Sequence, residues 1–498
     1  MNSQRKQDTG SDLSRLYGRV PAETRIPSEQ RVYCNRNLRL ASVGAIGFDL
    51  DHTLVHYKGP QLEELTYVLT RERLLARFGY PETLLQVPYE REFVIRGLVV
   101  DRRRGNILKM DYHNYVTRAY HGRRLLDPEE RKKSYRTGRV RMGGGTYVSV
   151  DTLFHLPEVF LFAVLVDMLD KGQLSPGVTP RKIYSDVREA IDSVHGDGTL
   201  KKKILGNIGR YVRHDPRLFH ALEEFRVAGK KLFLLTNSEW YYTDALMGYL
   251  RGRRGRSRKA DWLDAFDLVI ADAGKPDFFT DLRRPETERA RPRTGGPEVI
   301  HGGNARQLEG ALGFAGDAVL YFGDHTYGDI LRSKKTLGWR TAMLVEELED
   351  EIAATRRVQP QLDELNHWTA LRGLLEADLS ALVRKKSRAE RRIEEPRVDE
   401  VEVRSLKRTL AKLRRRQTAL EDELAGVQDM TRELGGKVQA AYNTYWGPLF
   451  REGGETSRFG HQVKDFACLY TTRVSNFLNY NPSHYFRSPR ERLPHDLD

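Results

Sequence analysis

Residues 43–54 read VGAIGFDLDHTL, and this stretch decides the fold class. An apolar run ends at Phe48, and two carboxylates, Asp49 and Asp51, follow it. A short, continuous apolar run is typical of a strand that is buried on both faces, as in a parallel sheet. The side chains that follow such a strand lie at the carboxyl edge of the sheet, which is where ligands bind in folds of this kind.

Four more apolar runs repeat the pattern along the chain. They are KLFLL before Thr236, FDLVI before Ala271 and Asp272, AVLYF before Gly323 and Asp324, and RTAMLV at 340–345. A helix is indicated ahead of KLFLL, where Asp215 is a candidate N-cap, Pro216 takes the first position and Gly229 lies past the end. Alternating strands and helices predict an α/β fold with a doubly wound parallel sheet.

The residues at the predicted strand ends form a chemically consistent set. It comprises four acids, three neutral donors and one cation: Asp49, Asp51, Asp324, Asp329, Thr236, Asn237, Ser238 and Lys275. Neighbouring carboxylates repel each other, and Mg²⁺, which prefers oxygen ligands, relieves that repulsion. A carboxylate nucleophile, a metal, a lysine and neutral donors predict a phosphoryl-transfer site. From the residues alone, the roles of Asp49 and Asp51 can be distinguished only by their order in the sequence, since Asp49 directly ends the strand.

The spacing of the runs indicates several parts. About 180 residues separate the first run from KLFLL, far more than one crossover helix needs. An α-rich domain is therefore expected there, with helices at 157–171 and 186–194, and the Pro-, Gly- and Arg-rich residues 285–303 are expected to form a loop. The expected parts are an N-terminal arm (1–40), a catalytic core (41–58 and 205–350), an inserted substrate domain (59–204), a helical hairpin (351–440) and a C-terminal tail (441–498).

A heptad pattern marks residues 403–434, where eight of ten seam positions are apolar. Such a seam forms either a coiled coil between chains or a hairpin within one chain. A hairpin with a partner helix at about 361–385 is the favoured interpretation, and pairing between chains stays open.

Composition narrows the class of protein further. The chain has 498 residues, 39% of them hydrophobic, with two cysteines and a formal charge of +14. No segment has the ~18 apolar residues of a membrane span, and the polar residues 1–14 do not resemble a signal peptide. A cytoplasmic location and no membrane partner are expected.

The basic clusters at 102–104 and 251–259 are interpreted as solvated loops rather than as a nucleic-acid surface.

The motifs DxDxT, TN, K and GDxxxxD, in this order, resemble those of the haloacid dehalogenase superfamily of phosphatases. Longer strings look like the cytosolic purine 5′-nucleotidase II family and its bacterial relatives: IGFDLDHTLVHY (46–57), LFLLTNSEWYYTDALMGYL (232–250), AGKPDFF (273–279) and LYFGDHTYGDILRSKK (320–335). Residues 186–201, DVREAIDSVHGDGTLK, are especially diagnostic. The resemblance extends from about residue 44 to 487 and is weaker in the charged loops and in the heptad segment.

This resemblance implies a haloacid dehalogenase-like core and a Mg²⁺-dependent 5′-nucleotidase for purine nucleoside monophosphates of the IMP or GMP type. It implies that Asp49 is the nucleophile, which forms an aspartyl-phosphate, and that Asp51 is the general acid and base. It further implies phosphoryl contacts from Thr236 and Asn237, charge neutralisation by Lys275, and a metal site made by Asp49, Asp324 and the main-chain carbonyl of Asp51, with Asp329 beside it. Phosphoryl transfer to a nucleoside is a further implied activity.

For the base and the sugar, the same resemblance implies contacts from Phe154, Arg188, Asp192, His195 and Lys201, with Phe154 stacking on the base. Arg188, Asp192 and His195 have the spacing of one helix face. Without the resemblance, the Arg–Asp pair would be interpreted as a surface salt bridge. Gly196 stands where the family commonly has an aromatic residue, which bears on the purine preference.

The stretch 459–485 is rich in aromatic residues: Phe459, Phe466, Tyr470, Phe477, Tyr480 and Tyr485. Aromatics at this density belong to a core or to an interface. Similar tails in the family contribute to subunit contacts, so a homodimer or homotetramer is expected.

Two other functions stay open. One is a phosphatase of the same fold for another phosphometabolite, such as a sugar phosphate. The other is a basic, non-catalytic scaffold that binds protein or RNA. The intact set of acids argues against the scaffold, because a binding module has no need of it.

Overall fold

The computed structural model describes residues 26–135, 140–252, 262–290, 297–396 and 399–489. Parts of several predicted segments lie outside these ranges: residues 1–25 of the arm, 253–259 of the basic loop, 291–296 of the Pro-rich segment and 490–498 of the tail. The chain divides into two compact units. Residues 350–454 form one, and the residues before and after them form the other.

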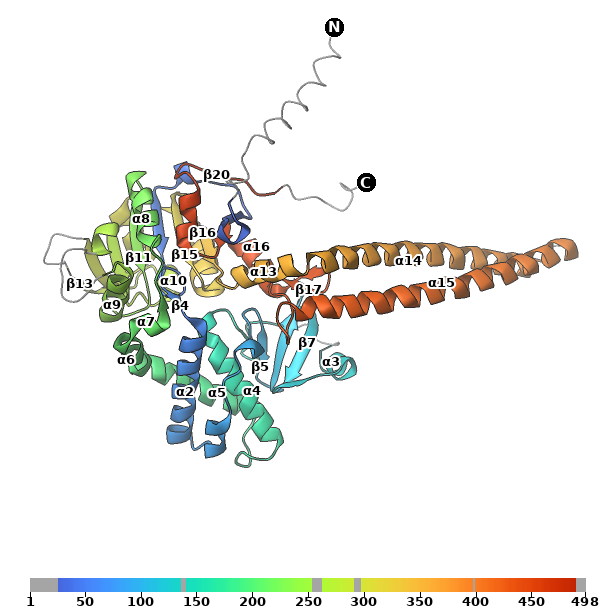
Figure 1. The fold of residues 1–498 in the computed structure, drawn as a ribbon, viewed down its shortest axis with the longest axis horizontal. Coiled ribbons are helices and arrows are strands. Elements are labelled where there is room, and N and C mark those ends of the chain that lie inside the picture. The colour runs from blue at the N-terminus through green and yellow to red at the C-terminus, as the bar shows by residue number, and fades with distance from the viewer. Residues whose placement is uncertain (1–25, 136–139, 253–261, 291–296, 397–398, 490–498) are drawn as a thin grey trace, which may run out of the picture. The chain divides into compact units, whose positions relative to one another are not determined.

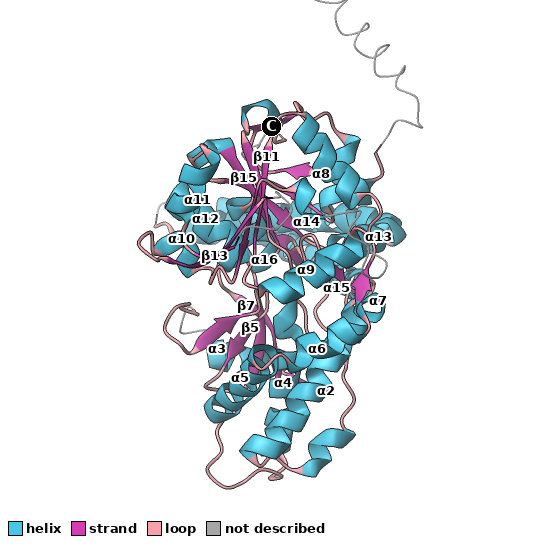
Figure 2. Ribbon diagram, turned by 90° about the vertical axis from the view of Figure 1, so that its left-hand side faces the viewer, coloured by secondary structure: helices cyan, strands magenta, loops and turns pink. Residues whose placement is uncertain are grey.

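A nine-stranded sheet forms the centre of the larger unit, in the order β1-β19-β16-β15-β3-β11-β12-β14-β13. Figure 2 shows strands of this sheet with helices on both sides. The strands from β19 to β14 run parallel, and the two edge strands are antiparallel to their neighbours. In chain order they are β1 (Tyr33–Cys34), β3 (Ala45–Phe48), β11 (Lys231–Leu235), β12 (Leu268–Ala271), β13 (Glu286–Ala290), β14 (Glu298–Gly302), β15 (Val319–Gly323), β16 (Arg340–Leu344) and β19 (Leu469–Thr471). All five apolar runs are strands of this sheet, which confirms the prediction of an α/β protein with a parallel-rich sheet.

The prediction of a loop at 285–303 is wrong for most of that segment. Strands β13 and β14 form an antiparallel pair, and β14 runs parallel beside β12. Only Val299 and Ile300 of β14 are apolar and buried. Two such residues are too few to be recognised as an apolar run.

Alternate strand residues enter two apolar clusters, one on each face of the sheet. Phe48 and Leu234 pack with α8 and α9, whereas Phe233 and Tyr321 pack with α10 and α11. The helices around the sheet are α8 (Leu218–Val227), α9 (Trp240–Leu250), α10 (Asp277–Thr280), α11 (Ala305–Leu312) and α12 (Arg332–Leu337). The helix predicted between the N-cap Asp215 and Gly229 is therefore present but begins two residues later than expected, at Leu218 instead of Pro216.

The segment between β3 and β11 holds an insertion of helices and a second sheet. Its helices are α2 (Gly59–Phe78), α3 (Pro128–Tyr135), α4 (Leu156–Asp170), α5 (Pro180–Gly196), α6 (Thr199–Gly206) and α7 (Ile208–Tyr211). Helices α4 and α5 correspond to the two that were predicted. The five-stranded antiparallel sheet was not predicted; it consists of β5 (Val99–Asp101), β6 (Asn106–Met110), β7 (Val116–His121), β8 (Arg124–Leu125) and β9 (Tyr147–Ser149). Where the chain leaves and returns, β4 (His56–Tyr57) pairs with β10 (Val212–Arg213).

The C-terminal segment belongs to the larger unit and completes its sheet. After α16 (Arg458–Phe466), β19 runs parallel to β16 and pairs with β1 on its other side. Further on, β20 (Tyr485–Phe486) pairs with β2 (Leu38–Arg39). Phe459 and Phe477 are buried within the chain itself, so these two aromatics belong to the core. A subunit contact by the tail stays a prediction.

The smaller unit is built on two long helices, α14 (Gln359–Glu394) and α15 (Glu400–Ala440), that lie side by side (Figure 1). Lys386 Nζ donates to Gln417 Oε1 at 3.0 Å, and Arg414 pairs with Glu390 at 3.5 Å, so the helices are antiparallel. The seam buries Leu382, Leu410, Leu420, Val427, Leu434 and Val438. The heptads therefore pair within one chain, as the hairpin interpretation predicts. Most of α13 (Leu348–Arg357) and all of β17 (Arg451–Glu452) also belong to this unit, whereas β18 (Glu455–Thr456) belongs to the larger one.

A helix that crosses a bilayer must be both long and apolar. None of the helices in the described ranges has the length and apolar character needed to cross a membrane.

Candidate active site

Adjacent strands of the central sheet bring the predicted polar residues to one edge. Strand β3 leads into Asp49, and its neighbours β15 and β11 lead into Asp324 and Thr236. The backbone N–H of Asp49 donates to the carbonyl of Phe322 at 2.9 Å. Because that bond continues the pairing of β3 with β15, the sheet itself fixes the position of Asp49 beside the end of β15.

Lys275 lies between two of the acids. Its Nζ is 2.8 Å from Asp49 Oδ1 and 2.7 Å from Asp329 Oδ1, and it donates to the Tyr321 hydroxyl at 3.0 Å. Burial alone would lower the pKa of Lys275, but Asp329 and Asp49 raise that pKa well above its usual range. Lys275 therefore stays positively charged and offsets part of the charge of the acids.

Three buried carboxylates, those of Asp49, Asp324 and Asp329, gather at this edge, with one oxygen of each within 4.8 Å of the others. Burial raises the pKa of Asp49 well above its usual range, although Lys275 acts in the opposite direction. Burial also raises the pKa of Asp324, against the lowering effect of His52 and Arg96. Shielded from solvent, the three acids fit a hard divalent cation, which takes carboxylate oxygens as ligands.

Asp51 takes part in a different set of contacts. Its two oxygens accept hydrogen bonds from the Tyr57 hydroxyl at 2.6 Å and from Ser238 Oγ at 2.7 Å. The Tyr57 hydroxyl is in turn 2.9 Å from the hydroxyl of Tyr242. The carboxylate of Asp51 is thus held in place by neutral hydroxyl groups, while that of Asp49 contacts a cation.

Thr236 and Asn237 organise the loop that carries Lys275. Thr236 is fully buried, and its Oγ1 accepts a hydrogen bond from the backbone N–H of Ser238 at 3.0 Å. The Asn237 side chain accepts from the backbone N–H of Lys275 at 2.6 Å and donates to its carbonyl at 3.0 Å. The structure thus gives the Asn237 amide a role in holding Lys275, in addition to the phosphate contact that was predicted.

From the insertion, Phe154 reaches the residues beside Asp51. Its ring packs edge-on against the rings of His52 and His195, with centroids 4.7 and 5.8 Å away. Close by in sequence, Thr152 Oγ1 lies 3.5 Å from Asp324 Oδ2. The predicted stacking residue and the acidic edge are therefore neighbours in space.

The guanidinium of Arg188 is occupied by other protein groups. Its NH1 donates to Glu158 at 2.9 Å and lies 3.2 Å from His155 Nε2, while Nε donates to Asp192 at 3.1 Å. Glu158 is buried, whereas Arg188 and Asp192 are partly open to solvent. The predicted Arg188–Asp192 pair is present, and a carboxylate that was not predicted, Glu158, completes it.

Lys201 and His195 are the other two predicted base and sugar contacts. Lys201 forms an ion pair with Glu239, and its Nζ lies 5.6 Å from the centre of the Tyr242 ring. Burial lowers the pKa of His195, and its Nε2 has no hydrogen-bond partner among the described residues. His195 thus has a free ring nitrogen beside Phe154.

Sequence reasoning missed several residues that support the acids. Arg96, whose side chain is fully buried, donates to the main-chain carbonyl of Asp324 at 2.9 Å and to Glu347 at 2.7 Å. His52 Nδ1 lies 3.1 Å from Glu346 Oε1. Arg96 comes from the insertion, more than 200 residues before Asp324, so no local motif connects the two. His52 lies inside the DxDxT motif, and only its place there singles it out.

Two comparisons with known proteins agree with this arrangement. Residues 32–498 match the model of the 5′ nucleotidase family. A 5′-nucleotidase domain-containing protein of Dictyostelium discoideum is 29% identical over 487 residues, which cover 94% of this chain and 75% of that protein.

Proposed function

The chain belongs to the 5′ nucleotidase family and is accordingly a phosphoric monoester hydrolase of nucleoside monophosphates, and we propose that its substrates are purine nucleotides of the IMP or GMP type and that it uses Mg²⁺. The observation that carries the proposal is the position of Lys275, between Asp49 and Asp329, with the Asp324 carboxylate in the same cluster. A buried cation among carboxylates suits a phosphate ester, because it offsets the charge of the phosphoryl group during transfer.

In the proposed reaction, a carboxylate oxygen of Asp49 attacks phosphorus and the bond from phosphorus to the 5′ oxygen breaks. Asp51 gives a proton to that oxygen, so that the nucleoside leaves as a neutral alcohol. Asp51 then takes a proton from water as the water attacks phosphorus, which releases inorganic phosphate and restores Asp49. The hydroxyl donors Tyr57 and Ser238 support this role, since they orient Asp51.

The acids and hydroxyl groups around Asp49 supply the rest of the proposed site. Asp49, Asp324 and the main-chain carbonyl of Asp51 would hold Mg²⁺, with Asp329 beside them. The ion would supply charge neutralisation for the phosphoryl oxygens. Thr236 and Asn237 are proposed to bind the same oxygens from the end of β11.

The purine preference rests on the residues of the insertion. Phe154 offers a ring close to Asp51 on which a base can stack, and His195 offers a free ring nitrogen beside it. Arg188, Asp192 and Lys201 are proposed to act at the edge of this region on the base or the sugar. An aspartyl-phosphate reacts with a nucleoside hydroxyl as well as with water, so the proposal includes phosphoryl transfer to nucleosides.

A substrate panel tests the proposal. Phosphate release is measured for purine and pyrimidine nucleoside monophosphates and for sugar phosphates, with Mg²⁺ and with chelator, and the Asp49→Asn variant serves as the blank. The expected result is preferred hydrolysis of IMP or GMP that requires Mg²⁺. Preferred hydrolysis of sugar phosphates would instead favour a phosphatase for another metabolite, and no hydrolysis at all would favour a scaffold.

A further inference from the structure

The two halves of the α14–α15 hairpin carry opposite charge. We define the turn half as residues 384–416 and the open half as residues 359–383 and 417–440. The turn half has fourteen Lys and Arg against six Asp and Glu, whereas the open half has three against nine. The formal charges are therefore +8 and −6. Antiparallel pairing places like charges of the two helices at the same level, so the hairpin is a rod with one basic half and one acidic half.

These charges face solvent. All nine acidic residues of the open half are exposed, and so are all but one of the described basic residues of the turn half. Within the described residues, Lys385, Arg388 and Arg415 form no ion pair with a carboxylate. Other charged residues do pair within the hairpin, as Arg414 does with Glu390 and Arg416 with Glu423. These pairs leave the net charges of +8 and −6 on the two halves unchanged, so each half can still attract a partner of opposite charge.

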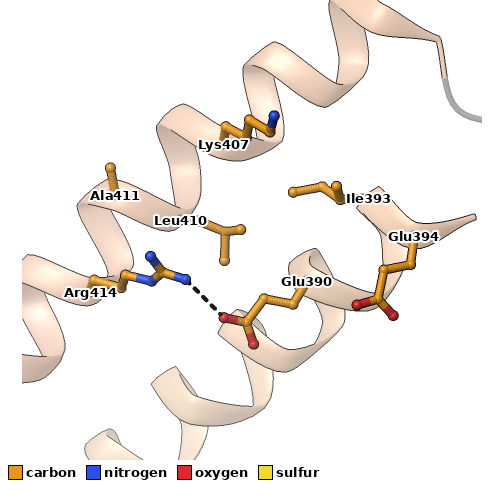
Figure 3. Close-up of a pocket in the computed structure, with 7 residues that line it drawn as sticks. All are labelled: Glu390, Ile393, Glu394, Lys407, Leu410, Ala411 and Arg414. Carbon is orange, nitrogen blue, oxygen red and sulfur yellow. Dashed lines mark hydrogen bonds and ion pairs between the residues drawn. The ribbon is translucent and has the colours of Figure 1, made fainter.

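One exposed apolar residue fits the same two-fold relation. In the turn half, a pocket between the helices is lined by three apolar residues (Ile393, Leu410 and Ala411) and four charged ones (Glu390, Glu394, Lys407 and Arg414) (Figure 3). In the open half, Leu374 is 67% exposed. Leu374 lies as many residues before the boundary between the halves as Ile393 lies after it.

We propose that the hairpin is a self-complementary docking surface for the hairpin of a second copy of this chain, lying antiparallel to the first. A two-fold axis at the boundary between the halves places the turn half of each copy on the open half of the other, as an isologous interface requires. The same axis brings Leu374 to the level of the pocket. A polyanion such as RNA would contact the basic half alone and would leave the exposed acids and the apolar groups without a role.

Charge reversal of each half tests the proposal on the full chain. One variant carries Lys385→Glu, Arg388→Glu and Arg415→Glu, and the other carries Asp378→Lys, Glu421→Lys and Asp422→Lys. The matched control keeps the charge: Lys385→Arg, Arg388→Lys and Arg415→Lys. Mass is measured by light scattering at micromolar concentration in low salt, and circular dichroism checks that each variant keeps its helix content.

The wild type and the control are expected at twice the 57.4 kDa chain mass or an even multiple of it. Each reversed variant should have half the wild-type mass, because its substituted half loses most of its charge: the turn half falls from +8 to +2 and the open half from −6 to 0. An equimolar mixture of the two reversed variants should recover the wild-type mass, since the unchanged open half of one (−6) then meets the unchanged turn half of the other (+8). High salt should weaken wild-type association by roughly tenfold or more, because it screens exposed charges.

Three results would overturn the proposal. The first is a wild type with the mass of a single chain in low salt. The second is that folded reversed variants keep the wild-type mass, and the third is a mixture that does not recover it. If the turn-half variant loses binding of a labelled RNA while its mass stays that of the wild type, the basic half serves a polyanion instead. Phosphate release is not used in this test, so failure here is distinct from failure of the proposed function.

Discussion

The acidic edge of the sheet and the polar face of α5 differ in how their charges are accommodated. At the edge, Asp49 and Asp329 share Lys275, and among the described residues Asp324 forms an ion pair only with Arg96, at 3.9 Å. All of these groups are buried, so solvent does not screen them. On α5, Arg188 contacts its carboxylates directly and is partly exposed. The edge is therefore a site that a bound cation and phosphate would complete. On the α5 face, the charges are already paired with one another without a ligand.

The substitution with the largest expected effect is Asp49→Asn. The amide is nearly isosteric with the carboxylate but is not a nucleophile, so kcat for nucleotide hydrolysis should fall by more than about a hundredfold, or ~2.7 kcal/mol in the barrier. The melting temperature should not fall. Asp317→Asn, at an exposed acid, is the control. If the Asp49 variant kept more than about a tenth of wild-type kcat, the assignment of the nucleophile would be wrong.

Metal dependence tests the edge without removing the nucleophile. Chelator should abolish nucleotide hydrolysis by the wild type, and added Mg²⁺ should restore it. Asp324→Asn should raise the Mg²⁺ concentration for half-maximal activity by roughly tenfold or more, because a charged ligand is lost. Calorimetric titration of Mg²⁺ gives the same comparison without turnover. Full wild-type activity in chelator would contradict a metal-assisted mechanism.

Arg188→Ala tests the α5 face. If Arg188 contacts the base, kcat/KM for IMP or GMP should fall by roughly ten- to a hundredfold, since a lost polar partner costs ~1–3 kcal/mol. Hydrolysis of a small aryl phosphate, which lacks the purine, should change far less. Burial raises the pKa of Glu158 and Arg188 lowers it, so loss of Arg188 should raise this pKa further and favour the neutral carboxyl, which limits the cost to the fold. Equal losses on both substrates would mean that Arg188 only supports the structure.

The smallest effect is expected for Tyr57→Phe. It removes one of the two hydroxyl donors to Asp51, a hydrogen bond to a charged group worth roughly 1.5 kcal/mol. The kcat should fall by about tenfold with KM nearly unchanged, as steady-state kinetics with a nucleotide can measure. Tyr241→Phe, at an exposed tyrosine on α9, is the control. Unchanged kcat would mean that Ser238 alone orients Asp51.

The parts of the fold that were predictable are those with a strong local signal. Five continuous apolar runs identified five strands, and the acids after them could be placed at one edge, because parallel strands share a direction. Strand β14 was missed because only two of its five residues are apolar and buried, and β19 was missed because it has only three residues. The antiparallel sheet of the insertion was missed because its strands mix polar with apolar residues, as in Asn106–Met110 and Val116–His121.

The candidate site divides in the same way. Asp49, Lys275 and Asp324 follow apolar runs and were predicted. Arg96 and Glu158 were not, because each acts on a residue far away in the sequence. A single sequence shows that both residues of such a pair are present but not that they lie close together in space. The long-range partners of buried charges could therefore be identified only from the structure.

The position of β19 has a consequence for synthesis of the chain. Strand β16 ends at Leu344, and the strand that covers its outer edge begins only at Leu469. At ~5–20 residues per second, the ribosome takes roughly 6–25 seconds to make the residues between them. During that time β16 is an uncovered edge strand, with unpaired backbone groups to which another nascent chain can add. A stop codon shortly before Leu469 would leave that edge open for the life of the protein.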